Sequence, residues 1–105
     1  MKGILIDPVQ KSVEYIESED GFTSAELHRL IGAEALDFCH PFGRTETVVV
    51  DDGGMFKRLV PFRIEGYDWI YGRAVIFGRD GGGGDRSTRL TVEEVHELVS
   101  FPLMT

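Results

Sequence analysis

The segment YDWIY, which begins at Tyr67, carries the residue types best suited to binding another molecule. In an extended chain Tyr67, Trp69 and Tyr71 lie on one face, and Arg73 continues the same row. Tyrosine, tryptophan and arginine are enriched at the energetic centres of protein interfaces. Together with Arg63, these residues predict a ligand or partner patch. Two alternatives stay open: the rings cover one end of a small core, or they stack on nucleotide bases between arginines.

The run GRDGGGG, residues 78–84, raises the question of a phosphate-binding loop. A P-loop ends in lysine followed by serine or threonine, whereas this run is followed by DRST. Asp80 and Asp85 bracket the four glycines, and their carboxylates would repel phosphate. Successive glycines carry high backbone entropy, which suits a flexible connection. We therefore predict a slack, weakly ordered loop before the second helix, in which alanines at Gly82 and Gly83 change little.

Metal and catalytic motifs are not evident in the sequence. Cys39, His40, His28 and His96 are the nitrogen and sulfur ligands, and none of them shows the spacing of a zinc site. No G-x-S-x-G elbow surrounds a serine, and the DDGG sequence at residues 51–54 lacks the alternating ligands of a calcium loop. We expect no cofactor, no metal and no catalytic residues, and the enzyme question leans towards no.

Composition favours one soluble domain. The chain has 105 residues, a length typical of a single domain, and its net charge is −7 from 18 acidic and 11 basic residues. An acidic surface repels phosphate backbones, so nucleic-acid binding is disfavoured. The single cysteine, Cys39, fits a reducing compartment, and no apolar run is long enough for a membrane span or a secretory signal. We expect a cytoplasmic protein.

Two short helices are predicted from their capping patterns. Thr23 with Glu26, and Thr91 with Glu94, have the spacing of capping boxes. The first helix presents an apolar stripe and ends at Gly32, which suits the left-handed position after a helix. The second carries a stripe that reaches residue 99 and ends before residues 101–102.

The remaining segments predict strands. Residues 3–6 and 12–17 form an N-terminal hairpin, and the β-branched run at 45–50 is expected at the centre of a sheet because both of its faces are apolar. Further extended segments are expected at residues 35–39, 55–60, 62–64 and 73–78, with 55–60 returning as the partner of 45–50. The order predicts an α+β fold over residues 1–105: a single mostly antiparallel sheet with two short helices packed on it.

Five segments that cover nearly the whole chain form a recognisable set: MKGILIDPVQKSVEYIE, AELHRLIGAEALDF, TVVVDDGGMFK, FRIEGYDWIYGRAVIFGRD and the terminal TVEEVHELVSF. Together they resemble domain-of-unknown-function family 3846, a set of small proteins common in phage, plasmid and actinobacterial genomes. The aromatic YDWIY and the long GGGG stretch depart from the family pattern. The resemblance implies an origin in a mobile element and transfers no catalytic residues.

These patterns lead to one functional expectation and one alternative. We expect a non-enzymatic accessory protein of a phage or plasmid, acting through protein–protein contacts with a host protein or with a second copy of itself as a homodimer. The alternative is a small-ligand or nucleotide-binding module that uses the aromatic and arginine patch. A DNA mimic is a third interpretation, weakened because arginines are interspersed among the acidic residues.

Overall fold

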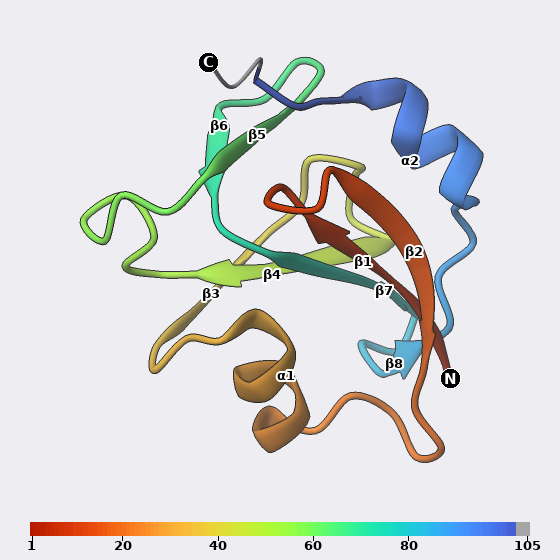
Figure 1. Cartoon of the computed structure of the whole chain (residues 1–105). Coiled ribbons are helices and arrows are strands. Elements are labelled where there is room, and N and C mark those ends of the chain that lie inside the picture. Colours follow the sequence, from red (N-terminus) through yellow and green to blue (C-terminus); the bar gives the residue numbers. More distant parts are fainter. Residues whose placement is uncertain (103–105) are drawn as a thin grey trace.

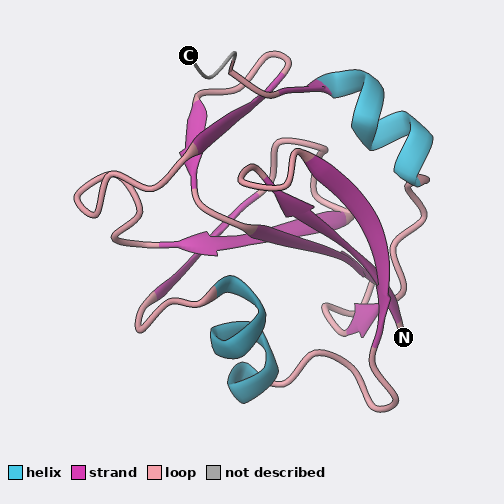
Figure 2. Ribbon diagram, viewed as in Figure 1, coloured by secondary structure: helices cyan, strands magenta, loops and turns pink. Residues whose placement is uncertain are grey.

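The computed structural model describes residues 1–102. Its elements, in chain order, are β1 (Lys2–Asp7), β2 (Ser12–Glu17), α1 (Ser24–Ile31), β3 (Leu36–Cys39), β4 (Glu46–Asp51), β5 (Pro61–Ile64), β6 (Trp69–Tyr71), β7 (Ala74–Arg79), β8 (Asp85–Arg86), α2 (Val92–Leu98) and β9 (Val99–Ser100). Figure 1 shows them coloured along the chain, and Figure 2 distinguishes helices from strands. No helix within residues 1–102 is both long and apolar enough to cross a membrane.

The strands form two antiparallel sheets. Six of them make a sheet with the order β2-β1-β7-β4-β3, in which β8 pairs with the end of β7. The other three make a small sheet with the order β6-β5-β9. The α+β class, the antiparallel pairing and the two helices are confirmed, but the prediction of a single sheet is wrong.

The second sheet exists because β4 has no free edge for the segment that follows it. Strand β4 lies between β3 and β7, so residues 55–60 have no place beside it. Instead, the Asp51 carboxylate accepts the backbone N–H of Gly53 at 2.8 Å, and Leu59 N–H donates to the carbonyl of Gly54 at 3.1 Å. The predicted return strand at 55–60 is therefore wrong, and the chain leaves the first sheet before β5 begins.

The other strand predictions agree with the structure. The hairpin of β1 and β2 is present, and the strands expected at 35–39, 45–50 and 73–78 appear as β3, β4 and β7. Val48 and Val49 are both fully buried, although successive side chains point to opposite faces. Strand β4 is therefore covered on both faces, as its apolar run predicted.

The helices lie on opposite sides of the six-stranded sheet (Figure 1). On one side, Leu27 and Ile31 of α1 pack against Val49, Val75 and Phe77. On the other side, α2 and the small sheet cover a second apolar cluster, whose members are Ile4, Ile6, Val13, Val48, Phe62, Ile64, Ile70, Ala74, Ile76, Val95 and Val99. The molecule is therefore layered, with the six-stranded sheet in the middle.

The capping patterns are realised to different degrees. In α2 the box is complete, because the Thr91 side chain accepts from Glu94 N–H and the Glu94 carboxylate accepts from Thr91 N–H. In α1 Thr23 caps the helix, but the Glu26 carboxylate accepts the hydroxyl of Ser18 at 3.1 Å. Helix α2 ends at residue 98, one residue earlier than its apolar stripe predicted, because the chain continues as β9 in the small sheet.

Candidate functional site

Strand β6 carries the predicted aromatic row and pairs with β5, so that Trp69 lies directly opposite Arg63. Ile70 points into the core, where it is 6% exposed, and its neighbours Trp69 and Tyr71 therefore face the other way. Trp69 is 44% exposed, and Tyr67, which precedes the strand, is 38% exposed. At least two of the three rings are thus available at the surface rather than packed away.

The three aromatic residues line an open cleft of about 350 Å³. The rest of the lining comes mainly from β3, from the end of β4 and from the turn that follows it; these residues are Asp37, Cys39, Val50, Asp51, Asp52 and Met55, with Asp68 and Ile70 beside the aromatics. The turn can approach β6 because residue 54 is glycine: a Cβ there would lie 2.2 Å from the carbonyl oxygen of Tyr71. The cleft therefore joins three segments that are distant in sequence.

The two arginines of the predicted patch do not line this cleft. Arg63 lies across from Trp69, but its Nε donates to the backbone carbonyl of Tyr67 at 3.3 Å. Arg73 pairs with the carboxylate of Asp7 at 3.3 Å and lines a different recess, near the end of α1. The structure thus brings the aromatic residues together, leaves Arg63 at their edge and separates Arg73 from them.

Carboxylates supply the charge of the cleft. Four aspartates line it, and Asp51 is already paired with Lys57 at 2.6 Å. Within the described residues no ion pair engages the other three, Asp37, Asp52 and Asp68. Such a surface attracts cations and repels phosphate. This charge favours a basic ligand or partner and disfavours stacking on a nucleotide.

Cys39 lies in the same cleft without the properties of a reactive thiolate. Burial raises the pKa of its thiol above the usual value; a side-chain hydrogen bond with Tyr67 opposes this rise, and the nearby Asp37 carboxylate adds to it. The pKa of Tyr67 is raised as well, first by burial and then by Cys39 and the nearby aspartates. Thiolate is the nucleophilic and metal-binding form of cysteine. At neutral pH this thiol is therefore protonated.

Within residues 1–102, no group of three or more histidine, cysteine, aspartate or glutamate side chains is arranged to hold a metal ion. The cleft is thus described by its aromatic rings, its carboxylates and a neutral thiol. These groups can recognise a cation through ion pairing and through the faces of the rings. The arrangement offers binding chemistry.

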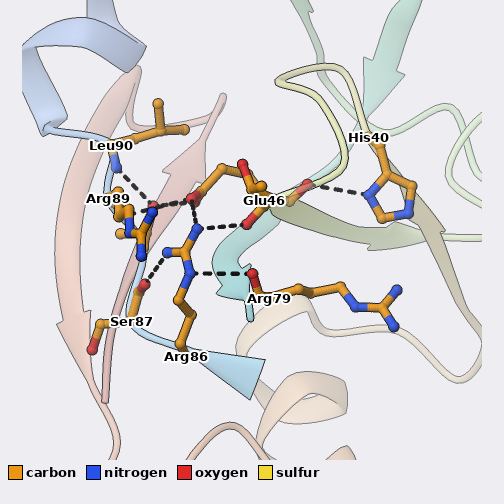
Figure 3. Close-up of polar contacts among 9 residues, drawn as sticks. His40, Glu46, Arg79, Arg86, Ser87, Arg89 and Leu90 are labelled. Atoms are coloured by element: carbon orange, nitrogen blue, oxygen red, sulfur yellow. Dashed lines mark hydrogen bonds and ion pairs between the residues drawn. The ribbon is translucent and has the colours of Figure 1, made fainter. Parts of the chain in front are cut away.

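A second polar cluster surrounds Glu46 at the start of β4 (Figure 3). Glu46 is 3% exposed, and its Oε2 accepts from Arg86 at 3.2 Å and from the backbone N–H of Arg89 at 3.3 Å. Its Oε1 accepts the hydroxyl of Thr88. Arg86 also donates to backbone carbonyls, namely those of Thr45, Arg79 and Ser87.

This cluster is better explained by folding than by chemistry on a ligand. Both carboxylate oxygens of Glu46 already accept hydrogen bonds, and the residue is buried. The donors come from residues 86–89, which connect β8 to α2. The cluster therefore fastens this connection to the central sheet. No local sequence pattern indicates it, because the partners are about 40 positions apart.

The glycine-rich run forms a tight turn between β7 and β8. Asp80 Oδ1 accepts the backbone N–H groups of Gly82 at 2.8 Å and Gly84 at 2.9 Å. The backbone N–H of Asp80 donates to the carbonyl of Gly84 at 2.8 Å. The prediction of a slack connection running to the second helix is therefore wrong in its geometry, because the loop closes a hairpin around its own aspartate.

Alanine substitutions at Gly82 and Gly83 are expected to differ in their effect on stability, in contrast to the sequence-based expectation that both change little. Gly83 has a φ of 86°, where a Cβ is strained, whereas Gly82 does not have a positive φ. We expect Gly83→Ala to lower the free energy of unfolding by about 1 kcal/mol and Gly82→Ala by clearly less. Urea denaturation of the two variants measures the difference, and equal values would contradict it.

The sequence indicated the aromatic half of the cleft and missed the acidic half. The sequence indicates Asp51 and Asp52 only as part of a turn that lacks the ligands of a calcium loop, and Asp37 only as part of a strand. Asp37 does lie in β3, whereas Asp51 is the last residue of β4 and the turn begins at Asp52. Because side chains alternate along a strand, the sequence of β3 indicates that Asp37 and Cys39 share a face of the sheet. Which aromatic residues lie near that face depends on the strand pairing.

Comparison with known proteins identifies a family for the chain. Neither the curated proteins nor the solved structures gave a significant match to the chain. The family resemblance noted in the sequence is confirmed, because the model of the family described as "Domain of unknown function (DUF3846)" matches residues 1–100. The chain therefore belongs to the DUF3846 family.

Proposed function

We propose that the protein is a non-enzymatic accessory protein of the phage or plasmid type, which acts in the cytoplasm by binding a basic segment of a partner protein. The observation that carries this proposal is the cleft, in which exposed aromatic rings lie beside three aspartates that have no basic partner within residues 1–102, namely Asp37, Asp52 and Asp68. The mobile-element setting rests on the resemblance to the family. The contact itself rests on the chemistry of the cleft.

An arginine or lysine of a partner fits this chemistry in two ways. Its charge can pair with Asp52 or Asp68, which line the cleft. Its guanidinium or ammonium group can also lie over the exposed ring of Trp69, a cation–π contact that contributes about 0.5–2 kcal/mol depending on solvent exposure. Arginine is also common at the energetic centres of interfaces. One basic side chain can thus contact both the aspartates and the Trp69 ring of the cleft.

Apolar groups around the cleft enlarge the contact beyond a single side chain. Met55, which lines the cleft, is 66% exposed, and the adjacent Phe56 is 92% exposed. Exposed apolar groups of this size near charged residues are typical of interaction surfaces. They support a partner protein over a free metal or a small cation.

A second copy of the same chain is a less suitable occupant. Each copy carries a net charge of −7, and the cleft itself is acidic. Pairing two acidic surfaces brings like charges together, which disfavours association. We therefore propose a heterologous partner rather than the homodimer.

Binding of a small ligand is the second candidate function. The cleft is concave and its size of about 350 Å³ lies near the lower end for ligand sites, roughly 300–1,000 Å³. The charge of its walls supports a small organic cation and gives no support to a nucleotide. A screen of polyamines and nucleotides by thermal shift separates this candidate from a peptide partner.

A peptide array tests the main proposal with a matched control. The array presents basic, neutral and acidic peptides to the wild-type protein and to two double variants. Asp52→Asn with Asp68→Asn removes two charges from the cleft, whereas Glu19→Gln with Asp20→Asn removes two charges that line a different recess. We expect basic peptides to bind the wild type and the control, and to bind the cleft variant at least about 10-fold more weakly. Equal loss in both variants would show a general charge effect and contradict the proposal.

A further inference from the structure

A second cavity, of about 310 Å³, lies on the face of the six-stranded sheet that α1 covers. Its apolar lining consists of Phe22, Leu27, Leu36, Phe38 and Phe77. The rings of Phe22 and Phe77 are stacked, with centroids 5.9 Å apart and planes at 25°. The cavity therefore offers an aromatic-lined space of the size that suits a small ligand.

Thr47 contributes an unusual polar group to this cavity. The residue is 4% exposed and lines the cavity, and its Oγ1 makes no hydrogen bond within the described part of the chain. Thr47 lies directly opposite Phe77 in the register of β4 and β7, so both side chains are on the same face of the sheet. Buried hydroxyl groups nearly always have a partner. An unpartnered hydroxyl beside a cavity therefore points to a polar atom that a ligand supplies.

A cation and an anion stand at the same cavity. Arg79 and Asp85 both line it, and they lie directly opposite each other in the β7–β8 hairpin. No ion pair between them is present in the part of the chain that the structure describes. The Arg79 guanidinium donates a hydrogen bond of 3.5 Å to the carbonyl of Gly83. Both charges are thus available to a ligand that carries the opposite pair.

We propose that this cavity binds a zwitterionic small molecule with an aromatic body, the chemistry of an aromatic α-amino acid. The ligand's carboxylate pairs with Arg79 and its ammonium group with Asp85. Its ring lies among the apolar side chains, next to Phe77. A polar atom on the ring, such as the phenol of tyrosine, exchanges a hydrogen bond with the Thr47 hydroxyl. This site is separate from the acidic cleft, and the inference does not depend on the proposed partner.

Titration with four probes tests which groups of the ligand the cavity recognises. L-tyrosine carries both charges, tyramine lacks the carboxylate, 3-(4-hydroxyphenyl)propionate lacks the ammonium group, and L-phenylalanine lacks the phenol. Two-dimensional NMR of the isotope-labelled protein follows the backbone signals of Thr47 and Phe77. We expect tyrosine to bind at least about 10-fold more tightly than tyramine or the propionate, the ratio that corresponds to 1.4 kcal/mol. Equal affinities, or no shift with tyrosine, would overturn the proposal.

Thr47→Val tests the hydroxyl, because valine keeps the shape and removes the polar atom. We expect this variant to lose the preference for tyrosine over phenylalanine and to melt at the wild-type temperature or above it, since the hydroxyl has no partner in the fold. A lower melting temperature would show that the hydroxyl is bonded within the protein, and would also overturn the proposal. Arg79→Gln should weaken tyrosine binding, whereas Arg29→Gln, an exposed arginine outside the cavity lining, should not.

Discussion

The Glu46 cluster and the acidic cleft lie at opposite ends of β4 and use charge in opposite ways. At Glu46 the carboxylate is 3% exposed, and arginine, threonine and backbone donors bond to both of its oxygens. In the cleft only Asp51 is paired within the described residues, and the aromatic rings beside it are partly exposed. A buried carboxylate whose oxygens both accept hydrogen bonds from the protein stabilises the fold and is not free to bind another molecule. Charges that stay open beside exposed rings are available to another molecule.

Glu46→Ala is expected to have the largest effect on stability. It removes the buried carboxylate partner of the partly buried Arg86, and breaking a largely buried ion pair in this way costs about 3–5 kcal/mol. The free energy of unfolding from urea denaturation is the measurement. Glu14→Ala, at an exposed position on β2, is the control and should stay within about 0.5 kcal/mol of wild type. If both variants unfolded alike, the cluster would not be the structural fastening described above.

Trp69→Ala is expected to show the reverse pattern. Because the indole is 44% exposed, its removal should lower the free energy of unfolding by no more than about 1 kcal/mol. Binding of a basic peptide identified on the array should weaken about 30-fold, the value that corresponds to a hot spot of 2 kcal/mol. Isothermal titration calorimetry and urea denaturation of the same preparation give both numbers. A large loss of stability with unchanged peptide binding would show that Trp69 supports the fold and does not contact the peptide.

Cys39 provides the smallest and most local test. The pKa of its thiol is raised by burial in the folded protein, so the reactive thiolate is scarcer than in the unfolded chain at the same pH. Iodoacetamide should therefore label the native protein more slowly than the urea-unfolded protein at pH 8, with a rate that climbs as the pH increases towards the raised pKa. Peptide bound in the cleft should slow labelling further. A native thiol that reacts as fast as the unfolded one would refute the burial argument.

Sequence reasoning was most successful where structure depends on neighbours in the chain. The helix caps Thr23 and Thr91, and the apolar run of β4, follow from local hydrogen bonding and side-chain size. The family was also recognisable from short motifs spread over the chain, and the family model matches residues 1–100. These features need no knowledge of which strands pair.

The errors arose where the outcome depends on distant segments or on one backbone angle. Residues 55–60 look like a strand, but β7 and β3 already occupy both edges of β4. The row of alternate residues was expected to continue to Arg73, but Gly72 has a φ of 98°, so the extended alternation ends there. The acidic side of the cleft required the pairing of β3 with β4, which no local pattern contains.

The turn closed by Asp80 has a consequence for anion binding that differs from simple repulsion. Its amide groups already hold an anion, namely the carboxylate of the same loop, at 2.8 and 2.9 Å. A phosphate from solution would have to displace a tethered competitor, whose effective concentration for so short a link is in the millimolar range or above. The amide groups of the loop are thus already occupied by its own carboxylate, and an anion of equal intrinsic affinity would exchange with it only above that effective concentration.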